Sequence, residues 1–97
     1  GEWVSSIDLE GMILQHDGVG ECAVVGVPDE KWGERPVALV VKNGDADEEG
    51  IKAMMADYAD KGIISRYGIP DRVIFVDELP RTSVGKLDKK KMRAEMV

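Results

Sequence analysis

Two apolar runs decide the fold of this chain: VGECAVVGV at residues 19–27 and PVALVV at residues 36–41. Both carry the β-branched residues that are typical of buried strands. We expect them to pair as an antiparallel hairpin with a long connection, the polar loop at residues 28–34. Trp32 lies in that loop and would form a lid over the end of the core or, alternatively, a surface for a partner domain or the flat ring of a ligand.

Helical patterns lie on both sides of this hairpin. Ser5 and Asp8 have the spacing of a capping box, and apolar residues follow at helical spacing, which predicts a helix that ends near residue 15 or 16. Asp47 is expected to cap a second helix, in which apolar residues 51, 54, 55 and 58 share one face. Gly62 would end that helix, because glycine accepts the left-handed conformation at a helix C-terminus.

A third strand and a third helix complete the pattern. VIFV at residues 73–76 is typical of a buried strand, and the segment from Asp88 onward begins like a helix. The order is therefore helix, strand, strand, helix, strand, loop, helix. It predicts an α+β two-layer domain, with a small, mainly antiparallel three-stranded sheet and helices packed on one face.

Length and composition limit what the chain could do alone. We expect residues 1–97 to form one domain, too small to hold the large pocket of an ATP-consuming enzyme. Hydrophobic residues make up 43% and charged residues 33%, which is typical of a soluble globular protein. No apolar run reaches the length of a membrane span and no signal pattern opens the chain, so a cytoplasmic location is expected. The abrupt start at Gly1 suggests a piece cut from a larger protein.

Charge is distributed unevenly along the sequence. Residues 1–80 contain seven Lys and Arg against seventeen Asp and Glu, a net of −10, whereas residues 81–97 contain six against two, a net of +4. The basic residues Lys89–Lys91 and Arg93 are interpreted as the solvated face of a terminal helix, or alternatively as an attraction for the phosphates of a ligand. Nucleic acid is disfavoured because the chain as a whole is acidic and has five aromatic residues for stacking.

Two single residues are candidates for chemistry but have simpler interpretations. Cys22 is the one cysteine and lies in an apolar run, so we interpret it as a core residue rather than a nucleophile. His16 is the one histidine and falls near the end of the first predicted helix. There it would be a partner for the helix dipole rather than a catalytic base.

The loop LPRTSVGKL at residues 79–87 carries the predicted chemistry. Pro80 ends the preceding strand and Gly85 permits a turn without a Cβ penalty, so Lys86 stands at the tip of a polar loop. A phosphate-binding P-loop is excluded, because it would need glycine at position 80 and Ser or Thr at position 87. We predict that Lys86 is a catalytic residue, one mobile positive charge presented to a site outside this domain.

Three ordered motifs carry a resemblance to a known family. GEWVSSIDLE at residues 1–10, VVGVPDEKWGERP at 24–36 and LPRTSVGK at 79–86 resemble the C-terminal domain of acyl-CoA synthetases, in the adenylate-forming superfamily. The similarity extends over essentially the whole chain and is greatest to the medium-chain and long-chain fatty-acid CoA ligases. It implies an enzyme that uses ATP to activate a carboxylic acid as an acyl-adenylate and then transfers it to coenzyme A.

The resemblance also implies roles for particular residues. Lys86 would bridge the substrate carboxylate and the α-phosphate of ATP, with Gly85 beside it as a cofactor-binding residue, while Thr82 and Ser83 shape the loop. The segment Gly1–Trp3 (Gly1, Glu2 and Trp3) would line the channel for the pantetheine arm of coenzyme A. Arg66 and Lys89–Lys91 are further candidates for the phosphates of coenzyme A, although solvated surface is the simpler interpretation.

The resemblance further places important parts outside this chain. The main partner would be an N-terminal domain of the same polypeptide, which would hold the acyl pocket, most ATP contacts and Mg²⁺. Many family members have a lysine at the position of Gly68, so a phosphate contact there is in doubt.

Two alternatives remain open at this point. The chain could be a binding module without catalysis that recognises a nucleotide or a protein through its basic end. It could also be the C-terminal part of an amino-acid adenylation domain. A reading frame several hundred residues longer on the N-terminal side would favour a ligase, and a carrier domain downstream would favour the adenylation domain.

Overall fold

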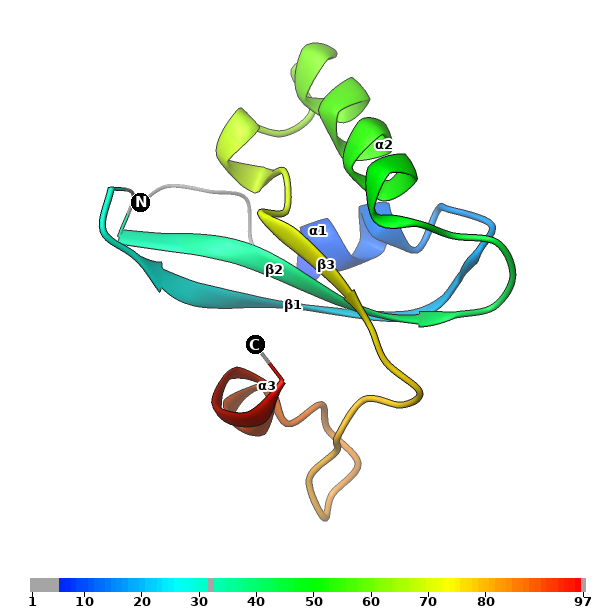
Figure 1. Ribbon diagram of the computed structural model, residues 1–97, viewed down its shortest axis with the longest axis vertical. Coiled ribbons are helices and arrows are strands. Elements are labelled where there is room, and N and C mark those ends of the chain that lie inside the picture. Colours follow the sequence, from blue (N-terminus) through cyan, green and yellow to red (C-terminus); the bar gives the residue numbers. More distant parts are fainter. Residues whose placement is uncertain (1–5, 32, 97) are drawn as a thin grey trace.

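The computed structural model describes residues 6–31 and 33–96. These residues form three α-helices, one short 3-10 helix and three strands (Figure 1). In chain order they are α1 (Ser6–Ile13), β1 (Val19–Asp29), β2 (Gly33–Lys42), α2 (Glu48–Asp60), η1 (Arg66–Gly68), β3 (Arg72–Phe75) and α3 (Lys89–Glu95).

The three strands form one mixed sheet in the order β1-β2-β3. β1 and β2 are antiparallel, as predicted, and β3 runs parallel to β2. The predicted long connection of the hairpin is wrong, because the ladder continues through Pro28↔Glu34 to Asp29↔Gly33. Pro28 suggested a loop, but β1 is an outer strand, where a residue without an amide hydrogen is tolerated.

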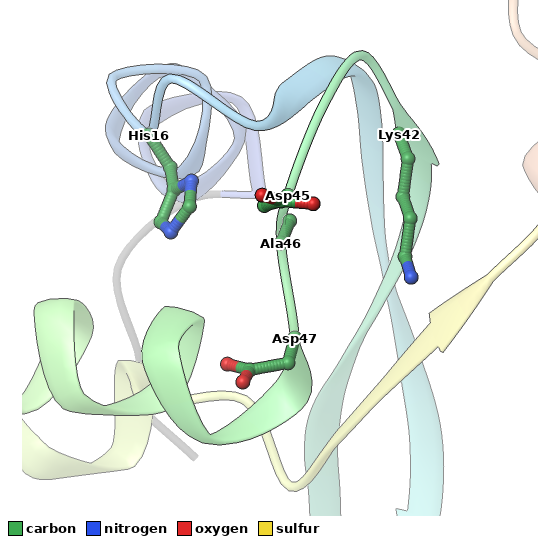
Figure 2. A pocket seen from close by; sticks show the side chains of 5 residues that line it. All are labelled: His16, Lys42, Asp45, Ala46 and Asp47. Carbon is green, nitrogen blue, oxygen red and sulfur yellow. The ribbon is translucent and has the colours of Figure 1, made fainter.

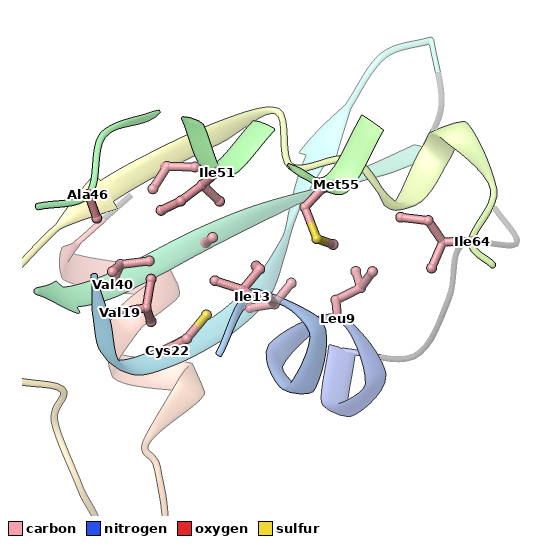
Figure 3. Packing of buried hydrophobic residues seen from close by; sticks show 12 residues of the cluster. Leu9, Ile13, Val19, Cys22, Val40, Ala46, Ile51, Met55 and Ile64 are labelled. Carbon is pink, nitrogen blue, oxygen red and sulfur yellow. The ribbon is translucent and has the colours of Figure 1, made fainter. Parts of the chain in front are cut away.

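Helices cover both faces of the sheet (Figure 1). α1 and α2 pack on one face, where Leu9, Ile13 and Met55 belong to the same buried cluster as Val40 (Figure 3). On the other face, Met92 of α3 belongs to a second buried cluster with residues of β1 and β2. This second cluster contains Ala23, Val25, Val37, Leu39, Leu79 and Met92.

The α+β class is therefore confirmed, whereas the expectation that helices cover only one face is wrong. Residues 22–25 and 37–40 are all buried, without the alternation of a half-exposed strand. Because successive side chains of a strand point to opposite faces, such runs present two apolar surfaces. Each surface has to be covered, which explains why α3 lies on the opposite side from α1 and α2.

The helix boundaries follow local hydrogen bonding. Asp47 caps α2 as predicted, its Oδ1 accepting from the amide of Gly50 at 2.6 Å. Gly62 follows α2 with a φ of 77°, the left-handed conformation expected there. α1 ends at Ile13, earlier than predicted, because the amides of Gln15 and His16 bond three residues back rather than four and tighten the turn. The predicted cap Ser5 lies outside the described residues.

Each outer strand donates a hydrogen bond to a glutamate from a helix. The amide of Val24 in β1 donates to Glu10 Oε2 of α1 at 2.7 Å, and the amide of Val73 in β3 donates to Glu48 Oε2 of α2 at 2.8 Å. We call Glu10 and Glu48 the edge carboxylates. They satisfy donors that an outer strand otherwise leaves open.

No helix within residues 6–31 and 33–96 has the combination of length and apolar character needed to cross a bilayer.

Candidate functional site

The predicted lysine lies in a tight hairpin, residues 81–88, which we call the lysine loop. Arg81 and Leu87 form an antiparallel bridge at its base, and the amide of Thr82 donates to the carbonyl of Lys86 at 2.7 Å. Gly85 turns the chain with a φ of 84°, in the left-handed region that favours glycine. The loop is thus closed by its own backbone bonds rather than by packing.

Thr82 makes most of the hydrogen bonds that close the loop. Besides its amide, its carbonyl accepts from the amide of Gly85 at 2.9 Å, and its Oγ1 accepts from the amide of Lys86 at 3.3 Å. Ser83, which we also expected to shape the loop, makes no side-chain hydrogen bond within the described part of the chain.

Lys86 is exposed at the tip of this loop. Among the described residues, its ammonium group has no hydrogen bond and no ion pair. The other cation of the loop, Arg81, is paired, with Nη2 2.6 Å from Glu21 Oε1 of β1 and Nη1 donating to the carbonyl of Gly85 at 3.3 Å. The loop therefore holds one charge in place and leaves the other available to a group outside this domain.

The basic run after the loop is not uniformly solvated. Lys89 Nζ lies 2.8 Å from Glu10 Oε2 and 3.0 Å from Ser6 Oγ, and the Lys89 side chain is only 28% exposed. Lys89 therefore joins α3 to α1, contrary to its interpretation as solvated surface, and its alternative role as a phosphate ligand stays a prediction. Lys90 and Lys91 are exposed, as the simpler interpretation expects.

The remaining coenzyme A candidates are not brought together with Lys86. Arg66 begins η1 and pairs with Asp60 at 2.6 Å, and η1 lies on the α2 side of the sheet, opposite the lysine loop (Figure 1). Gly1, Glu2 and Trp3 lie outside the described residues, as does Trp32. The structure therefore leaves these predicted roles untested.

Cys22 is buried, in agreement with its interpretation as a core residue. Burial raises the pKa of its thiol from 9.0 to about 12, with a smaller upward contribution from Glu10 and a downward one from Lys89. The thiol is protonated at neutral pH and has little nucleophilic character.

His16 lies in the turn that follows α1. Its Nδ1 accepts a hydrogen bond from the amide of Gly18 at 3.0 Å. Its expected role as a partner for the helix dipole stays a prediction.

His16 also borders a shallow, open hollow of about 290 Å³, which the sequence did not indicate (Figure 2). The hollow has side chains of both charges, and the Lys42 ammonium also lies 4.5 Å from the centre of the Phe75 ring. It is lined by His16, Lys42, Asp45, Ala46 and Asp47.

Within the described part of the chain, no three His, Cys, Asp or Glu side chains gather closely enough to hold a metal ion together.

Comparison with known proteins gives concordant matches. The model of the AMP-binding enzyme C-terminal domain family matches residues 8–86. Over 95 residues the chain is 41% identical to 3-methylmercaptopropionyl-CoA ligase of Ruegeria lacuscaerulensis, covering 98% of this chain and 17% of that protein. It is 40% identical to long-chain-fatty-acid–CoA ligase of Thermus thermophilus, also over 95 residues, with the same coverage.

A solved structure agrees with these relatives. The ATP-bound structure of MatB from Rhodopseudomonas palustris matches with a TM-score of 0.81 and 33% identity, over 94% of this chain and 18% of that one. The chain therefore corresponds to about a sixth of the length of the proteins it matches.

Proposed function

Because this chain belongs to the AMP-binding enzyme C-terminal domain family, we propose that it is the mobile C-terminal domain of an ATP-dependent acyl-CoA ligase. The two relatives above are CoA ligases, and the chain corresponds to 17% of each of them. In this proposal the larger remainder of the polypeptide is the principal partner. It would hold the acyl pocket, most contacts to ATP and Mg²⁺.

The observation that carries the proposal is the exposed ammonium group of Lys86, which has no partner among the described residues and stands on a hydrogen-bonded loop. In the first half-reaction, a carboxylate oxygen attacks the α-phosphorus of ATP and pyrophosphate leaves. Two anionic groups must approach each other, and negative charge moves to the leaving group. A compact ammonium between them would neutralise both, and its effect would be greatest in the transition state.

The second half-reaction would use a different surface of the same domain. After adenylate formation the domain would swing, withdraw Lys86 and present Gly1–Trp3 to the pantetheine arm of coenzyme A. Since the thiol then displaces AMP from the acyl-adenylate, no positive charge between carboxylate and ATP is needed at this stage. Lys86 should therefore matter for one half-reaction and not for the other.

We further propose a medium-chain or long-chain fatty acid as the substrate. The Thermus relative supports this choice, but a relative of nearly equal identity is named for a different acid. The acyl pocket would lie outside this domain, so the domain itself carries little information on chain length. A panel of carboxylic acids, assayed by pyrophosphate release on the full-length enzyme, tests the proposal, and no activity on fatty acids would overturn it.

The central test compares Lys86→Ala with wild type in the full-length enzyme. We expect adenylation to fall about a hundredfold to a thousandfold, whereas thioester formation from supplied acyl-adenylate stays near wild type. Lys61→Ala, which removes an exposed lysine paired with Asp57 on the far side of the domain, serves as the control for loss of a surface charge. An equal loss in both half-reactions would contradict the assignment of Lys86.

A further inference from the structure

We propose that Arg81 and Glu21 are positioning residues that set the direction of the lysine loop. One guanidinium group spans the gap between β1 and the loop tip, with Nη2 on Glu21 Oε1 and Nη1 on the carbonyl of Gly85. That carbonyl belongs to the residue before Lys86. This inference rests on the proposed function, because it concerns how Lys86 is aimed at a substrate on another domain.

Packing does not hold the loop tip. A Cβ built on Gly85 would meet no atom within 4 Å, and Val84 is 76% exposed. The backbone bonds between Thr82 and Lys86 fix the shape of the hairpin but not its angle to the sheet. That angle has to come from contacts that link the loop to the rest of the domain.

Such contacts occur on both sides of the loop, and both end on carboxylates of the segment α1–β1. Arg81 pairs with Glu21 before the tip, and Lys89 pairs with Glu10 after it. The two sides differ in burial, since Lys89 and Glu10 are 28% and 13% exposed, whereas Arg81 and Glu21 are 48% and 46% exposed. The more exposed pair, Arg81 and Glu21, can therefore be altered without disturbing the core.

Arginine suits this position because its planar fork presents several donors in fixed directions. One side chain can then hold a carboxylate and a carbonyl at the same time. Small misplacements of a group that must meet a reacting centre can lower a rate considerably. An exposed ion pair is weak, however, so we expect an effect of about two- to fivefold from its loss.

The kinetic test uses Glu21→Gln, Arg81→Met and the double variant in the full-length ligase. We expect Glu21→Gln to lower kcat of adenylation about two- to fivefold, with unchanged KM for ATP and acid and an unchanged thioester step. Arg81→Met should lower it further, because both contacts are lost, and the double variant should match Arg81→Met. Asp57→Asn, which breaks the exposed pair with Lys61 on α2, is the matched control and should leave the rate unchanged.

A second arm uses this 97-residue chain and needs no activity. Amide order parameters of Gly85 and Lys86 should fall from about 0.85 to below about 0.6 in Arg81→Met, with a smaller fall in Glu21→Gln. Unchanged order together with additive kinetic effects would overturn the proposal. If instead Lys86→Ala leaves adenylation intact, the proposed function fails, while the order parameters still decide whether Arg81 and Glu21 hold the loop.

Discussion

Lys86 and Lys89 lie three positions apart in one basic segment, yet the structure gives them opposite surroundings. Lys86 is exposed and has no partner among the described residues, whereas Lys89 is largely covered and bound to Glu10 and Ser6. The first is accessible to other molecules, which agrees with the role that we propose for it, and the second joins α3 to α1. A run of like charges therefore does not have one role, and each cation has to be assigned by its partners.

The largest expected effect separates the two lysines by activity. Lys86→Met in the full-length enzyme should lower adenylation at least about a hundredfold while changing the stability of the domain by less than about 0.5 kcal/mol. Lys89→Met should instead lower stability by about 1–2 kcal/mol, because Glu10 loses its cation and keeps only the amide of Val24 as a donor. Urea unfolding and pyrophosphate release measure the two quantities. A loss of stability in Lys86→Met would remove the contrast.

The edge carboxylates test the structural side of the comparison. Glu10→Ala should lower the free energy of unfolding by about 2 kcal/mol, because the amide of Val24 and the ammonium of Lys89 both lose their acceptor. Glu48→Ala should cost less, about 1 kcal/mol, since the Glu48 side chain is 45% exposed and water can replace it. Urea unfolding measures both losses of stability, as shifts of the midpoint without a change in the slope of free energy against urea concentration. Equal costs would show that burial does not set the difference.

Cys22 lies near Glu10 and Lys89, and its thiol should make the stability of the protein depend on pH. Its pKa is raised from 9.0 to about 12 in the folded chain, so above pH 9 the unfolded state loses this proton and the folded state keeps it. The contribution of Cys22 is constant below pH 9 and is lost as pH rises from there toward 12, by about 1.4 kcal/mol per unit. The difference in unfolding free energy between wild type and Cys22→Ala, measured at pH 7, 9 and 10, should show this slope. A difference independent of pH would contradict the burial of the thiol.

The smallest expected changes in stability concern Gly85, which precedes Lys86, and Gly11, which follows Glu10. Gly85→Ala should cost about 1 kcal/mol, because a side chain at a φ of 84° is strained although there is space for it. Gly11→Ala in α1, where a Cβ also meets nothing within 4 Å, should instead stabilise by about 0.5–1 kcal/mol. Thermal unfolding of the two variants gives the signs. Stabilisation by Gly85→Ala would mean that the loop does not need its left-handed turn.

The features predicted from the sequence are those that depend on neighbouring residues. The Asp47 cap, the Gly62 stop and the hairpin of β1 and β2 each follow from local residue types and were confirmed. The position of α3 was not predicted, because a fully apolar strand does not reveal which helix covers which face. The exposure of Lys86 could be expected from a polar loop, but its catalytic role remains a prediction.

The anchoring of the lysine loop could not be predicted at all. Glu21 and Arg81 are 60 residues apart, and Ser6 and Lys89 are 83 apart. Neither pair has a spacing or motif that marks it, and only the folded sheet brings them together. Glu21 is one of nineteen acidic residues in the sequence, and nothing in the sequence identifies it as the partner of Arg81.

The edge carboxylates have a consequence for the swing that we propose for this domain. Rotation against a larger partner would repeatedly bring surfaces into water that are covered at other moments of the cycle, and an open strand is the surface most prone to self-association. Glu10 and Glu48 occupy an amide on each border of the sheet, so a foreign strand would first have to displace a charged side chain. One small fold can thus combine the proposed swing with resistance to fibre-like polymerisation.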